Sequence, residues 1–459
     1  MKSKKHYVER AVEAPAEALQ LGYEGGQKIA RSMPMTGQQP FKKAKGYWYL
    51  LGPGLTTGAS DDDPSGIATY SQAGAQYGFG LLWLAAFTFP LMSVVQEMCA
   101  RIGLVTGRGL AGNIRAHFGK KVLYVSTIFL FAANTFNIGA DIGAMANAIQ
   151  LIKPHFNFGL LVVGFSVFIL LLQVFTPYVR YARYLKWLAL ILFAYIFSAL
   201  LAHPNWGNVL KNTFTPHVKF NKDSILLICA ILGTTITPYL FFWQTSQEIE
   251  EEIAAGQTTL KQRAGSTPAE IKRMRVDVWS GMFLSNIVMF FIIAACASVL
   301  FTHGITNITS AAQAADALRP FAGNASYWLF AIGILGMGLL AIPVLAASSA
   351  YAISESLGKR QGLNNKLKQG YAFYGVVIIS MLVGLGLNFI GLNPIKALIY
   401  SAVLNGVVAP IILVLILLIA GNRRIMGEWA NGKLSSSLGW ALTLLMTVSG
   451  VAAIYTLFA

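Results

Sequence analysis

The chain has 459 residues, of which 55% are hydrophobic and only 12% charged, and its mean hydropathy is +0.57. Long segments with almost no charge recur along it, and several exceed the roughly 20 residues that cross a bilayer. This pattern excludes a soluble protein with one large core. The formal net charge of +16 therefore needs an explanation other than nucleic-acid binding.

Eleven apolar segments follow one another along the sequence, separated by short polar gaps. We therefore predict an all-α integral membrane protein with eleven transmembrane helices, the first and the sixth of them broken. The predicted segments, in chain order, are 47–77 (broken), 79–105, 122–150, 158–177, 184–202, 223–250 (broken), 277–302, 322–355, 371–390, 394–420 and 437–458.

Three consecutive aspartates, Asp61, Asp62 and Asp63, lie inside the first apolar segment. Glycines and Pro64 beside them interrupt any continuous helix. Carboxylates at membrane depth are costly and are rarely kept without a use. A broken membrane helix that presents carboxylates to a polar cavity is typical of a cation site. Asp63 is also well placed to cap the second half-helix, a role that is compatible with ion binding.

The sixth segment carries a similar break, with Gly233, Thr234, Thr237 and Pro238 at its middle. Pro64 and Pro238 would each begin a second half-helix, where the missing N–H is not needed. The two breaks lie five spans apart, which predicts a five-helix inverted repeat whose broken helices meet at the midplane. Two independent proline kinks are the alternative. The predicted regions are a tail at 1–46 and a transporter at 47–459, with repeats at about 47–202 and 223–420 and an extra helix at 437–458.

The basic residues are distributed unequally between the two sides of the predicted membrane protein. With the N-terminus assigned to the cytoplasm, all but six of the 35 Lys and Arg fall on the cytoplasmic side. This distribution matches the positive-inside rule and predicts that the C-terminus lies outside. No signal peptide precedes the first span, and the tail is expected to be cytoplasmic. We expect the inner membrane of a bacterium, with the basic side against its anionic leaflet.

Signatures of other protein classes are missing from the sequence. Cys99, Cys229 and Cys296 are scattered through apolar segments and form neither a disulfide framework nor a metal motif. We find no nucleotide-binding loop, nucleophile elbow or zinc motif. We therefore predict no cofactor, no enzymatic activity and no nucleic-acid partner; the bilayer and a transported ion are the expected partners.

The second apolar segment contains the stretch QEMCARIGLVTGR at residues 96–108, and Gly52, Pro53 and Gly54 precede the first break. This sequence resembles the NRAMP family of divalent metal transporters, which have the LeuT-type fold. The resemblance covers about residues 45–420 and is most specific in the first, second and sixth spans. It implies transport of a divalent cation by alternating access.

The two breaks depart from the family's metal-binding motifs. The first-break motif of the family is Asp-Pro-Gly-Asn, and this chain has Asp-Pro-Ser-Gly at residues 63–66, so that Gly66 replaces the coordinating asparagine. The sixth-span motif of the family is Met-Pro-His, and this chain has Thr-Pro-Tyr at residues 237–239. Thr237 thus replaces the metal-binding methionine, and Tyr239 replaces the histidine linked to protons.

The third and tenth spans depart from the family as well. The third-span stretch Asp-Leu-Ala-Glu, implicated in proton movement, matches residues 137–140, where Asn137 replaces the aspartate and Asp141 follows one residue later. The tenth-span glutamine of the family matches Ala402, with Asn405 one turn on. Polar contact between helices is the simpler interpretation for Asn137 and Asp141.

The pattern resembles the NRAMP-related magnesium transporters, a branch that has lost the methionine and the asparagine. A thioether favours soft cations, whereas Mg²⁺ takes oxygen ligands and keeps several waters. Gly66 is expected to free volume for such water. Back-bonding of the threonines to their own helix is the alternative role for their hydroxyls. The predicted metal residues are Asp63, Gly66, Thr234 and Thr237; the predicted pathway or supporting residues are Asp61, Asp62, Ser65, Tyr239, Asn137, Asp141 and Asn405.

The preferred prediction is uptake of Mg²⁺, with Mn²⁺ also accepted, by alternating access and without tight proton coupling. The first alternative is a proton-coupled Mn²⁺ or Fe²⁺ transporter of the NRAMP type. A more distant alternative is an organic-solute transporter on the same fold, against which the three aspartates argue. A channel with an aspartate ring is a further alternative, although such rings usually arise from oligomer symmetry.

Overall fold

The computed structural model describes Trp48 and residues 51–176, 178–202, 204–217, 221–308, 311–391 and 393–458. The chain divides into a unit at residues 1–52 and a unit at residues 53–459, and the second is described below. The predicted cytoplasmic tail, 1–46, lies outside the described residues.

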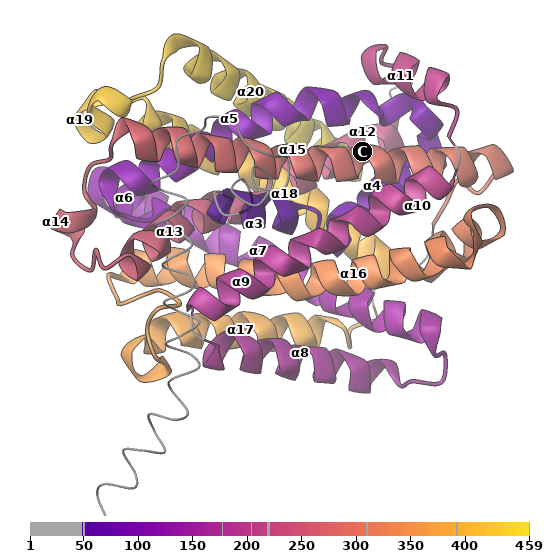
Figure 1. Ribbon diagram of the computed structural model, residues 1–459, viewed down its shortest axis with the longest axis horizontal. Helices are drawn as coiled ribbons and strands as arrows, with labels where there is room; N and C mark the ends of the chain where they lie inside the picture. The colour runs from indigo at the N-terminus through magenta and orange to yellow at the C-terminus, as the bar shows by residue number, and fades with distance from the viewer. Residues whose placement is uncertain are drawn as a thin grey trace, which may run out of the picture. The chain divides into compact units, whose positions relative to one another are not determined.

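The second unit is a bundle of α-helices, in which long helices run side by side (Figure 1). Short turns and small helices connect them. The helices are α3 (Pro53–Asp61), α4 (Pro64–Tyr77), α5 (Trp83–Thr106), α6 (Leu110–His117), α7 (Lys120–Ile152), α8 (Phe158–Phe175), α9 (Tyr178–Leu188), α10 (Phe193–Leu201), α11 (Trp206–Phe214), α12 (Lys222–Thr235), α13 (Pro238–Ala254), α14 (Leu260–Arg263), α15 (Pro268–Val299), α16 (Ala311–Leu357), α17 (Tyr371–Leu387), α18 (Pro394–Ala420), α19 (Arg423–Met426) and α20 (Lys433–Phe458).

The predicted transmembrane segments correspond to these helices in order. Within the described residues, nine helices or helix pairs are long and apolar enough to cross a membrane. The 17-residue helix α17 and the broken pair α3–α4 account for the two remaining predicted segments. Both predicted breaks are present: α3 ends at Asp61 and α4 begins at Pro64, while α12 ends at Thr235 and α13 begins at Pro238. The mostly helical, membrane-spanning fold class is confirmed.

Several helix boundaries differ from the prediction. Helix α15 begins at Pro268, nine residues before the apolar segment, because Thr267 and Glu270 form a capping box: the Thr267 N–H donates to Glu270 Oε2 at 2.8 Å. Helix α16 includes Gly323 with a left-handed φ of 75°, so the membrane-length part begins there, close to the predicted start at 322. The limits of an apolar segment therefore do not coincide with the limits of its helix. A capping box starts α15 earlier, and Gly323 interrupts α16.

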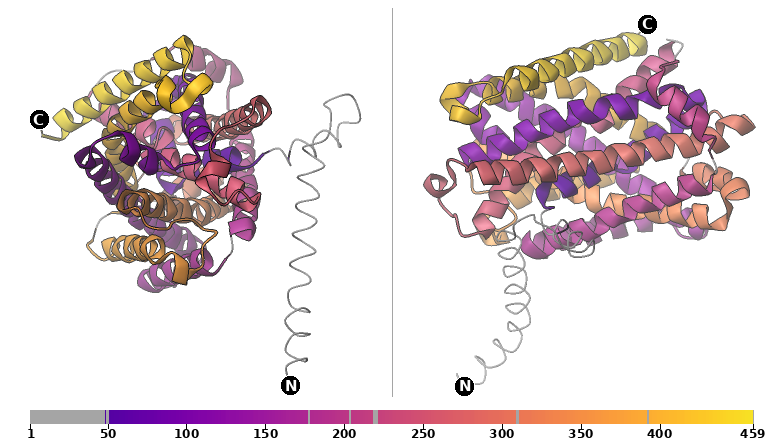
Figure 2. Two further views of the ribbon diagram at one scale, coloured as in Figure 1. Left: turned by 90° about the vertical axis from the view of Figure 1, so that its left-hand side faces the viewer. Right: turned by 45° about the horizontal axis from the view of Figure 1, so that its top comes forward.

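The two broken helices lie inside the bundle, and α8 and α20 lie on opposite outer faces (Figures 1 and 2). Helix α8 exposes Leu160 and Phe175, and α20 exposes Leu444 and Tyr455. Apolar side chains on an outer face are expected where lipid, not water, surrounds the protein. Helices α12 and α13 are instead mostly buried. The polar breaks are thereby kept away from lipid.

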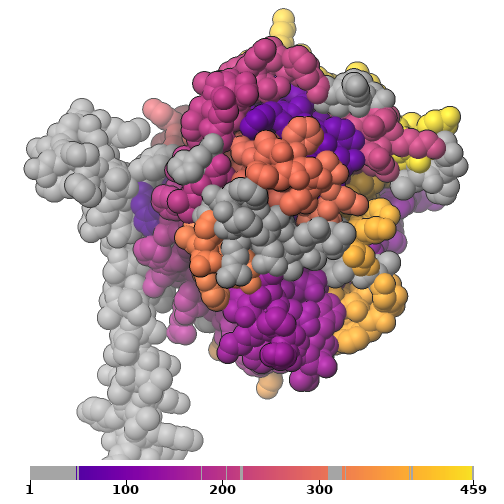
Figure 3. Space-filling view, turned by 90° about the vertical axis from the view of Figure 1, so that its right-hand side faces the viewer, coloured from indigo at the N-terminus to yellow at the C-terminus, as the bar shows by residue number. Residues whose placement is uncertain are grey.

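One end of the bundle is formed by the ends of several helices and their connections. Figure 3 looks onto this end, where the orange segment near residue 300 lies between the magenta segment near residue 210 and the purple segment near residue 155. A 3-10 turn at Phe301–His303 follows α15 there. The breaks of α3–α4 and α12–α13 are in the interior, roughly between the two ends.

Helix α15 supports the first half-helix along its whole length. The carboxylate of Asp277 accepts the backbone N–H groups of Gly54 at 2.7 Å and Leu55 at 3.1 Å, which satisfies two donors at the start of α3. Glycines allow the backbones to touch, since a β-carbon added at Gly58 would overlap the carbonyl of Gly281. Close approach through small residues is a common way to join helices in membranes.

We predict that Gly58→Ala lowers the free energy of unfolding by about 1–3 kcal/mol, because the added methyl group forces α3 away from the α15 backbone. Thermal denaturation in detergent, followed by size-exclusion chromatography, measures this effect. Gly375→Ala is the matched control, since nothing lies within 4 Å of the position its β-carbon would take. Equal melting temperatures for the Gly58→Ala variant and the control would contradict the packing argument.

Candidate metal site at the two helix breaks

Asp63 lies between the halves of the first broken helix and caps the second half. Its backbone is extended, with φ −64° and ψ 170°, and its Oδ1 accepts the Gly66 N–H at 2.7 Å. The side chain is buried, with 1% of its surface exposed. The predicted cap is present, and the positive end of α4 favours a negative charge there. One carboxylate oxygen is thus held by the backbone of the helix it begins.

The other carboxylate oxygen of Asp63 is held by the third span. Asn137 of α7 donates from Nδ2 to Asp63 Oδ2 at 2.7 Å. The Oδ1 of Asn137 accepts from the Ser401 hydroxyl of α18 at 2.6 Å. Ser65 donates to the Leu398 carbonyl at 3.1 Å and so joins the first turn of α4 to α18 as well. Three helices therefore meet at this carboxylate.

The second break lies directly beside the first. A β-carbon added at Gly66 would be 3.1 Å from Thr234 Oγ1 and 3.3 Å from the carbonyl oxygen of Asp61. The structure thus brings Asp63, Gly66 and Thr234 together. Thr237 is the N-cap residue of α13, and its buried hydroxyl has no hydrogen-bond partner. The hydroxyl of Thr234 is also buried without a partner, so neither threonine bonds back to its own helix.

The expected extra space at Gly66 is absent from this conformation. Neighbouring atoms at 3.1–3.4 Å would already crowd a single added carbon. The reason is that the Thr234 hydroxyl and the end of α3 close over the glycine. The missing side chain alone therefore leaves no room for a further group at Gly66 in this conformation.

Two tyrosines tie the broken helices to each other. Tyr239 of α13 donates to the carbonyl of Ser60 in α3 at 2.6 Å. The hydroxyls of Tyr70 in α4 and Thr235 in α12 are 3.1 Å apart. Backbone carbonyls freed by a break need such partners within a membrane. Tyr239, predicted to border the pathway, thus serves as a structural donor in this conformation.

The remaining acidic residues differ in how well their oxygens are paired. Asp61 Oδ2 accepts from the Ser285 hydroxyl of α15 at 2.7 Å. Asp62 and Asp141 are completely buried, and neither oxygen of either carboxylate has a hydrogen-bond partner. The Oδ1 of Asn405 is buried and unpaired too. Buried polar atoms without protein partners mark positions where water or an ion completes the contacts.

The sequence missed several residues that complete this site. Ser285, Ser401, Tyr70 and Thr235 all contact the breaks, yet each is an ordinary polar residue within an apolar helix. Their only sequence signal is a hydroxyl at membrane depth. Among the described residues, no three His, Cys, Asp or Glu side chains are grouped so that they hold a metal. A metal at the breaks would thus depend on hydroxyl and carbonyl oxygens beside Asp63.

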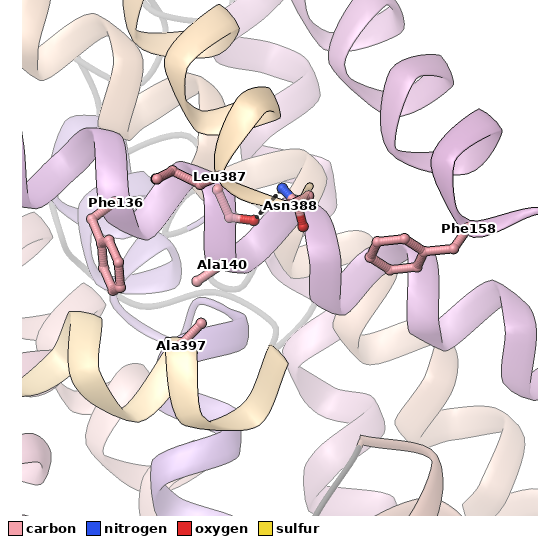
Figure 4. A pocket seen from close by; sticks show the side chains of 7 residues that line it. Phe136, Ala140, Phe158, Leu387, Asn388 and Ala397 are labelled. Carbon is pink, nitrogen blue, oxygen red and sulfur yellow. Dashed lines mark hydrogen bonds between the residues drawn. The ribbon is translucent and has the colours of Figure 1, made fainter. Parts of the chain in front are cut away.

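A pocket of about 180 Å³ lies close to Asn137 and Ser401. Figure 4 shows its lining, where Ala140 of α7 and Ala397 of α18 face each other and Asn388, the C-cap residue of α17, bonds to the neighbouring helix. The Asn388 Nδ2 donates to the Gly139 carbonyl at 2.9 Å. Ala140 and Ala397 are each one helical turn from the hydrogen-bonded pair Asn137 and Ser401. The pocket is lined mainly by apolar residues, and Asn388 is the polar side chain in its lining.

Comparisons with known proteins agree with this fold. The family described as "Natural resistance-associated macrophage protein-like" (Nramp) matches residues 54–456. A match over most of the chain defines a membrane transporter and not an enzyme, and the chain belongs to the Nramp family.

Individual relatives are distant in sequence but similar in extent. The divalent metal cation transporter MntH of Klebsiella pneumoniae subsp. pneumoniae is 24% identical over 86% of this chain and 91% of its own. MntH of Caldanaerobacter subterraneus subsp. tengcongensis is 24% identical over 86% and 90%. The structure is similar to that of the Eremococcus coleocola manganese transporter, with a TM-score of 0.69, 19% identity and coverage of 92% and 88%. The LeuT-type fold is thereby confirmed.

We predict that Asp63→Ala abolishes divalent-cation uptake into liposomes, because Asp63 is the one carboxylate that the first break shares with the family motif. Asp223→Ala, which removes an exposed acid at the start of α12, is the control and should transport normally. Size-exclusion profiles establish that both variants are folded. Uptake by a folded Asp63→Ala variant at the rate of the control would reject the site.

Proposed function

We propose that this Nramp family transporter carries Mg²⁺, accepts Mn²⁺ as well, and works by alternating access without obligatory proton coupling. Divalent metal cation transport is the activity in the names of the MntH relatives. The observation that supports Mg²⁺ is the donor set at the breaks: one carboxylate, two threonine hydroxyls and the carbonyl of Asp61, with Thr237 where the family has a thioether. Hard oxygen donors suit Mg²⁺.

Only some of the acceptor sites of the Asp63 carboxylate are used by protein donors, which suits an ion that keeps its water. An ionised carboxylate has about four lone-pair sites, and two are used by Gly66 and Asn137. The remaining ones can accept from water bound to Mg²⁺, which sheds its hydration shell reluctantly. The unpaired hydroxyls of Thr234 and Thr237 offer further contacts to such water. A single close carboxylate is therefore sufficient for a hydrated ion.

Alternating access follows from the closed packing at Gly66. Because the Thr234 hydroxyl and the Asp61 carbonyl crowd this position, a hydrated ion cannot enter while the breaks are in contact. The contacts that would have to change include the hydrogen bond from Tyr239 to Ser60 and the pairing of Tyr70 with Thr235. Movement of one pair of half-helices relative to the other would open the site to one side at a time.

The absence of tight proton coupling is proposed from the residues that replace the family's titratable groups. Tyr239 donates a hydrogen bond to a backbone carbonyl, and its phenol does not titrate near neutral pH. Asn137 has no proton to exchange and donates to Asp63. The basic side of the protein is taken as cytoplasmic. Without proton coupling, the membrane potential and the ion gradient would drive cation entry.

A second candidate function is proton-coupled Mn²⁺ or Fe²⁺ transport, and Asp141 favours it. This carboxylate is completely buried in α7, one turn after Asn137, and both of its oxygens are unpaired. Asp141 is thus the residue that would carry a proton if metal and proton movements were linked.

We predict that Gly66→Asn combined with Thr237→Met raises the ratio of Mn²⁺ or Cd²⁺ uptake to Mg²⁺ uptake by about tenfold. The substitutions add a soft sulfur ligand and fill space with an amide that must displace the Thr234 hydroxyl. Metal content of liposomes after competition uptake gives the ratio.

The control for this variant is Gly375→Asn with Thr443→Met, which makes the same changes in α17 and α20, away from the breaks. The control should keep the original ratio. An unchanged ratio in the folded Gly66→Asn, Thr237→Met variant would place ion selection elsewhere in the protein.

We predict that Mg²⁺ or Mn²⁺ entry into liposomes causes no matching acidification of the lumen. The assay uses an enclosed pH-sensitive dye, an imposed metal gradient and a potassium diffusion potential. Asp141→Asn should transport like the original protein, since no proton passes through it. Acidification in step with metal entry, lost in Asp141→Asn, would reject the uncoupled mechanism and establish the second candidate.

A further inference from the structure

We propose that Ser401 is a positioning residue for the metal carboxylate, and that it acts through the amide of Asn137. The inference rests on the proposed function in one respect, namely that Asp63 is a metal ligand. Ser401 itself does not contact Asp63. It lies in α18, in the tenth span, and its hydroxyl is completely buried.

The three side chains form a directional chain of hydrogen bonds. Ser401 donates to Asn137 Oδ1 at 2.6 Å, and Asn137 donates from Nδ2 to Asp63 Oδ2 at 2.7 Å. All three residues are at most 1% exposed, so water does not compete for these contacts. An amide has an acceptor at one end and donors at the other, whereas an ionised carboxylate only accepts. The chain therefore runs in one direction, from serine to carboxylate.

The opposite orientation of the Asn137 amide is disfavoured at the carboxylate end. It would place Oδ1 against Asp63 Oδ2, so that two acceptors would face each other at hydrogen-bond distance. It would also turn the amide donors toward Ser401. The serine hydroxyl has a second acceptor within reach, the Leu398 carbonyl at 2.7 Å in its own helix. Ser401 supports the binding orientation because it supplies the proton that the buried Oδ1 requires.

Removal of this proton donor would leave Asn137 Oδ1 buried and unpaired. An unpaired buried acceptor is costly, so the amide would shift toward other donors and loosen its contact with Asp63. The Asp63 carboxylate would then be held at only one of its two oxygens, and the group could rotate. Groups that orient a metal ligand through a hydrogen bond affect metal affinity even though they do not touch the metal. The expected consequence is weaker ion binding at an otherwise intact site.

Ser401 also belongs to the contact between α18 and the start of α4. Its hydroxyl is 3.2 Å from the Ser65 hydroxyl, and Ser65 donates to the Leu398 carbonyl. A simple structural role in this contact is the competing interpretation. The two roles differ in what they predict: a structural role changes stability and maximal rate, whereas positioning changes the affinity for the ion.

The chain offers a close control for the structural role. Ser380 of α17 is completely buried, like Ser401, and donates to the carbonyl three residues earlier, Val377, at 2.9 Å. The Ser401 hydroxyl lies at a similar distance, 2.7 Å, from the Leu398 carbonyl, which competes with Asn137 Oδ1 for its single proton. Ser380→Ala and Ser401→Ala thus each remove a completely buried serine hydroxyl that lies beside a carbonyl of its own helix, and only Ser401→Ala removes the partner of Asn137.

The test measures Mn²⁺ and Mg²⁺ affinity by calorimetry on purified protein and KM and maximal rate by uptake into liposomes. For Ser401→Ala we expect Kd and KM to rise by about three- to tenfold with little change in maximal rate. Ser380→Ala should match the original protein, and Ser401→Thr should restore affinity because it keeps the hydroxyl. If Ser401→Ala does not fold, Ser401→Thr and Ser401→Val, which have nearly the same shape, give the same comparison.

A second measurement tests the route through Asn137. Asn137→Ala should weaken binding by itself, and adding Ser401→Ala should cause no further loss, because the two residues act in series. Additive losses, an unchanged affinity for Ser401→Ala, or a fall in maximal rate alone would each overturn the positioning role. Failure of the proposed function has different signs: wild-type protein that does not carry Mg²⁺, or an Asp63→Ala variant with normal affinity.

Discussion

The buried carboxylate of Asp63 is the constraint on which the centre of this transporter depends. An ionised group away from water is costly unless hydrogen bonds and opposite partial charges surround it. The chain has no described cation paired with Asp63 and uses neutral donors instead: the Gly66 N–H at the start of α4 and the amide of Asn137. These dipoles stabilise the negative charge of the carboxylate but do not cancel it. The carboxylate therefore still attracts a metal ion.

That constraint determines which helices meet at the breaks. Helix α7 supplies the amide donor, and α18 supplies the hydroxyl that orients it. The carbonyls and N–H groups released by the breaks need partners too, since lipid offers none. The bond from Tyr239 to Ser60 and the pairing of Tyr70 with Thr235 supply links between the two broken helices. The hydrogen bonds that join the two broken helices at their interruptions also hold the candidate site closed.

Helix α15 holds the first half-helix at both of its ends. Asp277 accepts the N–H groups at the beginning of α3, and Ser285 donates to Asp61 at its end. Contact between Gly58 and Gly281 lies between these two bonds. A rotation of α3 away from α15 would break all three contacts together. Helices α3 and α15 are thus joined at three places along α3.

The sequence by itself determined the membrane class, the number and order of the spans and the positions of both breaks. Hydropathy over twenty residues and the chemistry of Pro64 and Pro238 are local properties, so no tertiary contact was needed to recognise them. The identity of Asp63 as the capping carboxylate was also predictable, because an aspartate before proline at a helix start is a local signal. The family resemblance carried the expectation for Gly66 and Thr237, and a hydroxyl beside the second break carried the expectation for Thr234.

Only the tertiary structure decided how these residues are paired. Ser401 and Asn137 are 264 positions apart, and Ser285 and Asp61 are 224 apart, so no local pattern relates them. The crowding at Gly66 depends on how closely α12 approaches α4, which side-chain packing determines and composition does not. Hydrogen bonds between distant segments form where the fold places donor beside acceptor. For that reason the sequence predicts the candidate residues, and the fold determines which of their oxygens are hydrogen-bonded and which have no partner.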